Sequence, residues 1–162
     1  MSIDVNELIH LATQKGLTIA TAESCTGGMV AAALTDVPGS SAVLDRGFVT
    51  YSNDAKIEML GVNDTTLERV GAVSEEVAVE MAEGALARAG VSLAVSITGI
   101  AGPGGSEFKP EGRVCFALAA RDAETHVETI EFGALGRREV RAASRDRALS
   151  LLQNYIFNSG QK

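Results

Sequence analysis

Ser24, Tyr51 and Lys56 are the side chains of this sequence whose types best suit nucleophilic catalysis. A serine hydroxyl is a weak nucleophile until a base removes its proton, and His10 and His126 do not lie in motif-like settings. Lys56 is the next candidate base, because a lysine kept neutral by desolvation or by a nearby cation can accept a proton. Tyr51 is a candidate to relay that proton between Ser24 and Lys56.

These three residues also have ordinary structural explanations. Ser24 could cap a helix, Tyr51 suits the end of a strand, and Lys56 suits the solvated face of a helix. Cys25 competes with Ser24 as the nucleophile, although small buried cysteines are common. Periodicity alone does not decide between these interpretations.

Two glycine-rich stretches are candidates for binding an anion or a nucleotide. Gly27 and Gly28, after Thr26, open a predicted helix, where free N–H groups and the helix dipole favour a phosphate or an oxyanion. A tight turn would explain the same pair. The second stretch follows Thr98 and reads Gly99-Ile-Ala-Gly102-Pro-Gly-Gly-Ser106; it matches neither the P-loop nor the dinucleotide fingerprint.

Arg137 and Arg141 are four residues apart near the start of a predicted helix, so they share one face and could clamp a phosphate. A solvated face paired with Glu139 and Asp146 is the alternative.

The pattern of apolar residues and turn signals predicts alternating helices and strands. Asp4, Asn53 and Ser74 are the expected helix caps, and Gly16 and Gly90 the expected stops. We predict helices over 4–15, 29–34, 53–60, 74–89 and 137–157, and strands over 17–22, 43–51, 93–97, 114–120 and 127–132.

This order predicts one α/β domain over residues 1–162, a three-layer α/β/α sandwich around a mixed, mostly parallel sheet of about five strands. The last two strands are expected to form an antiparallel hairpin. Ligands of open α/β sheets collect at the carboxyl ends of strands. Because Ser24, Tyr51 and Thr98 lie at such ends, their loops are expected to converge on one pocket.

Composition excludes several classes of function. The formal net charge of −7 disfavours general nucleic-acid binding, which needs a basic surface. No apolar run is long enough to cross a bilayer, and the first residues do not resemble a signal peptide, so we expect a cytoplasmic protein with no membrane partner. Two cysteines and two histidines, not in metal-site spacing, predict no metal.

Four segments in order resemble the C-terminal domain of the competence/damage-inducible protein CinA and its stand-alone relatives, the nicotinamide-nucleotide amidases. They are Thr21-Ala-Glu-Ser-Cys-Thr-Gly-Gly28, Gly47-Phe-Val-Thr-Tyr-Ser-Asn53 with Lys56, Gly71-Ala-Val-Ser74, and Gly99-Ile-Ala-Gly-Pro103. The resemblance spans about Leu8 to Leu152, and it favours the catalytic interpretation of Ser24, Tyr51 and Lys56 over the structural one.

The resemblance implies hydrolysis of nicotinamide mononucleotide to nicotinate mononucleotide and ammonia, in pyridine-nucleotide recycling, with no cofactor. Ser24 would be the nucleophile, and Lys56 with Tyr51 would transfer protons. Backbone N–H groups around Thr26–Gly28 would stabilise the oxyanion. Thr98, Gly99, Gly102, Arg137 and Arg141 are the further expected substrate-binding residues.

Two departures from the family pattern concern the substrate loops. The loop after Pro103 is about one residue shorter than usual, and the Gly-x-Arg pattern before the last helix appears as Leu135-Gly-Arg-Arg138, so either arginine could meet the phosphate. Relatives are commonly oligomeric, which predicts a homodimer. A non-catalytic nucleotide-binding module and a Ser-Lys hydrolase of a different amide or ester are the alternative functions.

Overall fold

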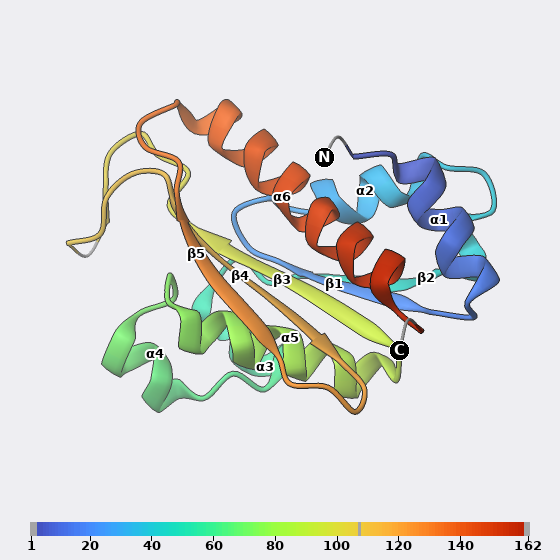
Figure 1. The fold of residues 1–162 in the computed structure, drawn as a ribbon. Coiled ribbons are helices and arrows are strands. Elements are labelled where there is room, and N and C mark those ends of the chain that lie inside the picture. The colour runs from blue at the N-terminus through green and yellow to red at the C-terminus, as the bar shows by residue number, and fades with distance from the viewer. Residues whose placement is uncertain (1–2, 107, 161–162) are drawn as a thin grey trace.

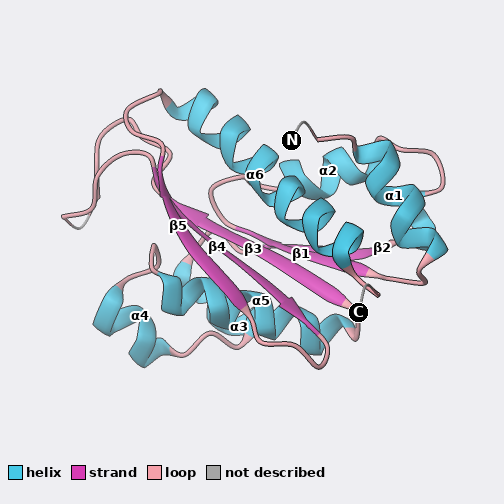
Figure 2. Ribbon diagram, in the orientation of Figure 1, coloured by secondary structure: helices cyan, strands magenta, loops and turns pink. Residues whose placement is uncertain are grey.

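The computed structural model describes residues 3–106 and 108–160. These form three layers, with one five-stranded sheet between two layers of helices (Figure 1, Figure 2). The strand order is β2-β1-β3-β4-β5. The strands are β1 (Ile19–Glu23), β2 (Leu44–Val49), β3 (Leu93–Gly99), β4 (Arg113–Ala120) and β5 (His126–Glu131).

The sheet is mixed, as predicted. β1 pairs in parallel with β2 and with β3, whereas β4 pairs antiparallel with β3 and with β5. Four of the five strands therefore run in one direction, and β4 alone runs against them. Because β1, β2 and β3 are parallel, their carboxyl ends meet at one edge of the sheet.

Helices cover both faces of the sheet (Figure 2). One face carries α1 (Val5–Gln14), α2 (Met29–Thr35) and α6 (Arg137–Asn158), which contact each other. The other face carries α3 (Asn53–Leu60), α4 (Asp64–Val70) and α5 (Glu75–Ala89). A short 3-10 turn, Ser40–Ala42, precedes β2. None of the described helices is long and apolar enough to span a membrane.

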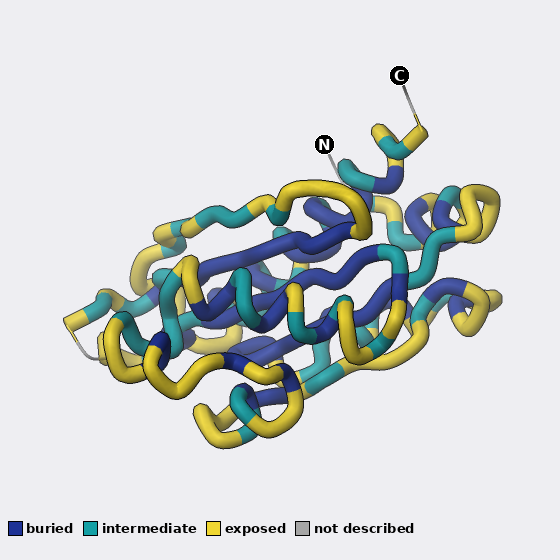
Figure 3. Tube along the Cα trace, turned by 90° about the horizontal axis from the view of Figure 1, so that it is seen from below, coloured by how far each residue is buried: buried dark blue, intermediate teal, exposed yellow. Residues whose placement is uncertain are grey.

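The central strands are the most buried part of the fold, while both edge strands are partly exposed (Figure 3). β1 and β3 are buried along nearly their whole length, which fits strands covered by helices on both faces. Leu8, Phe116 and Leu152 pack on the α6 side, and Val77 and Met81 on the α5 side, so each helical layer closes its own part of the core.

Most element boundaries agree with the sequence predictions within one or two residues. Asp4 and Ser74 cap α1 and α5 as expected, since their side chains accept from the N–H groups of Glu7 and Val77. The predicted Asn53 cap is wrong. Ser52 caps α3, because its hydroxyl accepts from Ala55 N at 3.0 Å.

Helix α4 was not predicted. Its seven residues show no clear helical spacing of apolar side chains, and a side chain of another helix binds its first turn. Glu80 of α5 accepts from the N–H of Asn63 at 2.7 Å and from the hydroxyl of Thr66 at 2.7 Å. This stabilisation is long-range, so a local pattern does not reveal it.

Gly84 allows α5 and the end of α3 to approach closely. A Cβ atom built at this position would lie 1.9 Å from the carbonyl oxygen of Leu60, which is backbone and cannot move aside cheaply. We expect Gly84→Ala to lower the free energy of unfolding by about 1–3 kcal/mol through overpacking, although alanine is the better helix former.

Denaturant unfolding of Gly84→Ala beside Ala87→Gly tests this expectation. Ala87 is exposed in the same helix, so its change reports helix propensity alone, at about 1 kcal/mol. A Gly84→Ala protein as stable as the parent would show that the two backbones are not tightly packed there.

Candidate functional site

The carboxyl ends of β1, β2 and β3 surround a pocket of about 330 Å³, a size typical of small-molecule sites. Ser24, Tyr51 and Thr98 all line it, as the sequence predicted for loops that follow these three strands. Its other lining residues are Cys25, Asn53, Lys56, Ala72, Val73, Gly99, Ile100, Ala101, Gly102, Pro103, Gly104, Gly105, Ser106 and Arg137.

Ser24 and Lys56 are in direct contact in this pocket. Lys56 Nζ lies 2.9 Å from Ser24 Oγ, although the residues are 32 positions apart. The amine also donates to the carbonyl oxygens of Thr50 at 2.8 Å and Tyr51 at 3.2 Å. The strand-to-helix turn after β1 presents Ser24, and the first turn of α3 presents Lys56.

Lys56 is suited to act as a base. Only 1% of its surface is exposed, and the described part of the chain gives it no carboxylate partner. Burial lowers the pKa of its amine from 10.5 to about 8, because the charged form loses its hydration. A substantial fraction of Lys56 is therefore neutral slightly above neutral pH.

Cys25 is a poor alternative nucleophile. Burial raises the pKa of its thiol to about 11, so the reactive thiolate is scarce at neutral pH. Ser24, by contrast, has its base in contact.

Tyr51 lies at the pocket, but its phenol does not bridge Ser24 and Lys56. The side chain is 61% exposed, and its hydroxyl accepts from Arg137 Nη2 at 2.8 Å. The contact of Tyr51 with Lys56 is made by its backbone carbonyl. Because Lys56 contacts Ser24 directly, no relay is needed between them.

Arg137 joins two walls of the pocket. Besides Tyr51, its guanidinium donates to the carbonyl oxygen of Gly102 at 2.7 Å. Arginine carries five N–H donors in a planar fork, so further donors remain for an anion.

Arg141 is placed differently from Arg137. It does not appear among the described residues that line the pocket, and its guanidinium donates to the backbone carbonyls of Cys25 at 3.0 Å and Thr26 at 3.4 Å. The structure therefore does not join Arg137 and Arg141 into one clamp.

The start of helix α2 is occupied by a side chain of the protein itself. The buried carboxylate of Glu23 accepts from Val30 N at 3.0 Å, Ala31 N at 3.1 Å and Thr26 Oγ1 at 2.6 Å. Thr26, Gly27 and Gly28 also lie outside the described pocket lining. A substrate phosphate at this helix start, one of the two expected anions, is thus disfavoured.

The glycine-rich loop after β3 forms another wall, and neighbouring segments fix its position. Thr98 Oγ1 donates to the carbonyl oxygen of Ala72 at 2.9 Å, and Lys109 Nζ donates to those of Val70 at 2.5 Å and Val73 at 2.6 Å. The Gly71–Ser74 segment is therefore bound to both ends of this loop. No motif or spacing in the sequence pointed to this role of Lys109.

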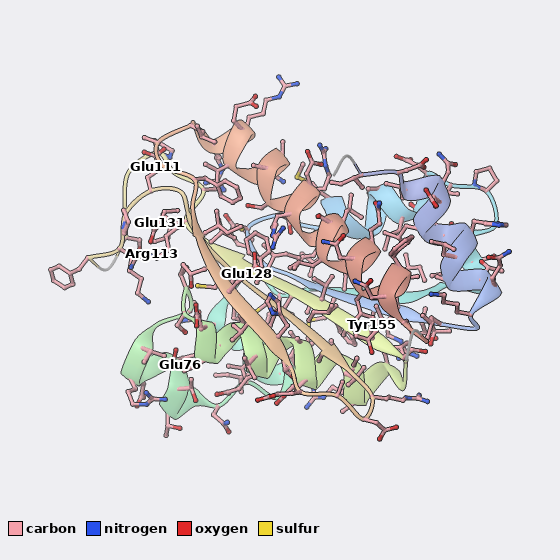
Figure 4. All side chains as sticks on the ribbon, viewed as in Figure 1. Glu76, Glu111, Arg113, Glu128, Glu131 and Tyr155 are labelled. Atoms are coloured by element: carbon pink, nitrogen blue, oxygen red, sulfur yellow. The ribbon has the colours of Figure 1, made fainter. Side chains whose placement is uncertain are left out.

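Figure 4 labels Glu111, Arg113 and Glu131 where this loop returns to the sheet. Arg113 Nε donates to Glu131 at 2.6 Å across β4 and β5. Gly102 has a φ of +93°, and a Cβ atom there would come within 2.1 Å of Glu111 Oε1. The positive φ is the reason glycine is favoured at this wall, since the Glu111 side chain is flexible and can move aside.

Within the described residues, no group of three or more His, Cys, Asp or Glu side chains is arranged to hold a metal ion. The pocket instead offers a hydroxyl, an amine, a guanidinium and backbone groups.

Solved structures with this fold are similar over almost their whole length. The competence/damage inducible protein CihA of Agrobacterium tumefaciens is 49% identical, with a TM-score of 0.86, covering 95% of this chain and 99% of that one. The competence damage-inducible protein A of Klebsiella pneumoniae subsp. pneumoniae MGH 78578 is 37% identical, with a TM-score of 0.89, covering 96% and 99%.

Curated relatives are of two lengths. A CinA-like protein of Chlorobium phaeobacteroides (strain BS1) is 59% identical over 129 residues, which are 78% of this chain but 31% of that protein. The chain thus spans about a third of such longer relatives. The nicotinamide-nucleotide amidohydrolase PncC of Escherichia coli (strain K12) is 57% identical over 127 residues, 74% of this chain and 77% of that one.

The model of the CinA C-terminal domain matches residues 4–156, which include every strand and all pocket-lining residues. The chain belongs to the CinA C-terminal domain family.

Proposed function

We propose that this chain is an amidohydrolase that converts nicotinamide mononucleotide and water to nicotinate mononucleotide and ammonia. The observation that carries the proposal is the 2.9 Å contact between Ser24 Oγ and the buried amine of Lys56. The name of the 57% identical relative PncC supports the choice of substrate.

The first half-reaction forms an acyl-enzyme. Ser24 Oγ attacks the carboxamide carbon while its proton passes to neutral Lys56. The resulting tetrahedral intermediate carries a negative oxygen, which backbone N–H groups of the Ser24 turn stabilise. When the intermediate collapses, the C–N bond breaks, Lys56 returns the proton to the leaving nitrogen, and ammonia departs.

The second half-reaction hydrolyses the ester on Ser24. Lys56 removes a proton from a water molecule, which attacks the acyl carbon, and the proton returns to Ser24 Oγ as nicotinate mononucleotide leaves. Arg137, at the mouth of the pocket, is the cation we assign to the substrate phosphate. Tyr51 would orient Arg137 through the 2.8 Å hydrogen bond, in place of relaying a proton.

Ammonia release from four related compounds tests the proposal. With nicotinamide, its riboside, its mononucleotide and the dinucleotide, we expect rapid release from the mononucleotide and slow release from the riboside, which lacks the phosphate. Ser24→Ala should release none. Release by Ser24→Ala at the parent rate would remove Ser24 from the mechanism.

The same assay separates the alternatives. Binding of the mononucleotide without turnover by the parent would indicate a nucleotide-binding module. Turnover of other amides or esters in preference would indicate a Ser-Lys hydrolase with a different substrate.

A homodimer, a cytoplasmic location and a single domain over residues 1–162 stay predictions. Light scattering on the purified protein measures the first of them.

A further inference from the structure

The turn that carries Ser24 is held from two sides. Glu23 holds one side, because its buried carboxylate binds the Thr26 hydroxyl and two N–H groups of α2. Arg141 of α6 holds the other side through the carbonyl oxygens of Cys25 and Thr26. The nucleophile turn is thereby fixed to helices on the same face of the sheet.

The carbonyl groups of Ser24, Cys25 and Thr26 in this turn are all occupied. That of Ser24 accepts from Gly27 N at 3.1 Å, and that of Thr26 accepts from Met29 N at 3.1 Å as well as from Arg141. The carbonyl of Cys25 accepts from Arg141 Nε at 3.0 Å.

Two N–H groups of the turn remain for a ligand. Across the described residues, those of Thr26 and Gly28 find no acceptor. The Cys25 N–H contacts its own thiol, and Cys25 lines the pocket next to the nucleophile. Because C=O and N–H point in opposite directions across a trans peptide, holding the Cys25 carbonyl also fixes the Thr26 N–H on the side away from Arg141.

We propose that Arg141 is a positioning residue, which sets the peptide between Cys25 and Thr26 so that the free Thr26 N–H meets the oxyanion formed beside Ser24. The substrate in this assignment comes from the proposed function. The geometry comes only from the contacts of Arg141 with the turn. The assigned role differs from the phosphate-binding role expected from the sequence, because the guanidinium of Arg141 is directed at the nucleophile turn.

Steady-state kinetics of Arg141→Ala and Arg137→Ala separate the two roles. We expect Arg141→Ala to lower kcat at least tenfold, with KM for nicotinamide mononucleotide nearly unchanged and an equal fold loss on the riboside. Arg137→Ala should instead raise KM for the mononucleotide by a larger factor than KM for the riboside, with a smaller loss of kcat than Arg141→Ala. A selective rise of KM for the mononucleotide in Arg141→Ala would assign Arg141 to the phosphate and overturn the proposal.

A second measurement does not depend on the natural substrate. A fluorophosphonate reacts with an activated serine: the Oγ–P bond forms, the P–F bond breaks, fluoride leaves, and Lys56 takes the proton. The phosphoryl oxygen then occupies the oxyanion position. We expect mass spectrometry to show Ser24 labelled at least tenfold more slowly in Arg141→Ala, with partial recovery when guanidinium ion is added.

The labelling experiment also separates failure of this inference from failure of the proposed function. A parent protein that is labelled but does not hydrolyse the mononucleotide would refute the substrate while leaving the comparison of variants valid. Arg141→Lys covers the case in which Arg141→Ala does not fold, because lysine keeps the charge but lacks the planar guanidinium whose Nε and Nη2 reach the two carbonyls separately. Parent-rate labelling in every folded Arg141 variant would overturn the positioning role.

Discussion

Lys56→Met is expected to lower kcat for ammonia release by about 10²–10⁴-fold, the usual contribution of a general base. The change removes the amine that lies 2.9 Å from Ser24 Oγ but keeps an unbranched side chain of similar length. Continuous ammonia detection with nicotinamide mononucleotide measures the loss. Since the fold is expected to survive, circular dichroism of the variant should match that of the parent.

Lys15→Met is the matched control. Lys15 lies at the end of α1 and donates to the carbonyl oxygens of Ile156 and Ser159 at the far end of α6 from the pocket. Its loss should leave kcat unchanged. A Lys56→Met protein with most of the parent's activity would exclude Lys56 as the base and would leave the mechanism without one.

The same assignment predicts how the parent's rate depends on pH. Only neutral Lys56 accepts the proton of Ser24, and burial lowers its pKa to about 8. We therefore expect kcat/KM to rise about tenfold per pH unit below 8 and to level off above it. A profile that is flat from pH 6 to 9 would contradict a neutral lysine base.

The sequence identified most of the pieces of this site, because its strands and turns follow local rules. An apolar run bounded by Gly16 and the Gly27-Gly28 pair placed Ser24 on a strand-to-helix turn, which the structure confirms. The 2.9 Å contact of Ser24 with Lys56 depends on the register of β1 against β2, which local patterns do not determine.

The arginines show what helical spacing cannot predict. Arg137 and Arg141 are one turn apart on α6, yet their guanidinium groups bind different partners. The carbonyls of Cys25 and Thr26 attract Arg141, whereas the loop carbonyl of Gly102 and the phenol of Tyr51 attract Arg137. Spacing gives the shared face of a helix, and the acceptors that tertiary packing brings near it decide where each side chain binds.

The lowered pKa of Lys56 also predicts a pH-dependent cost to folding. In the unfolded chain a lysine titrates near 10.4, so between pH 8 and pH 10 the unfolded state binds more protons than the folded state. Stability rises with pH wherever that is so. Burial of the charged amine therefore lowers the free energy of unfolding by its largest amount below pH 8. This destabilisation decreases as the pH approaches 10.

We expect the free energy of unfolding of the parent, relative to that of Lys56→Met, to increase by about 2 kcal/mol from pH 7 to pH 10. Urea unfolding of both proteins at several pH values measures this difference, with Lys15→Met as the control for loss of a positive charge. Taking the difference between variants cancels the other titrating groups. The parent alone has the hydrogen bonds of Lys56 to Thr50 and Tyr51, which add a constant difference in the free energy of unfolding between the two proteins. The test is therefore how that difference changes with pH, not its size at one pH. A difference that does not change with pH would mean that Lys56 stays charged in the folded protein, and a charged amine cannot take the proton of Ser24.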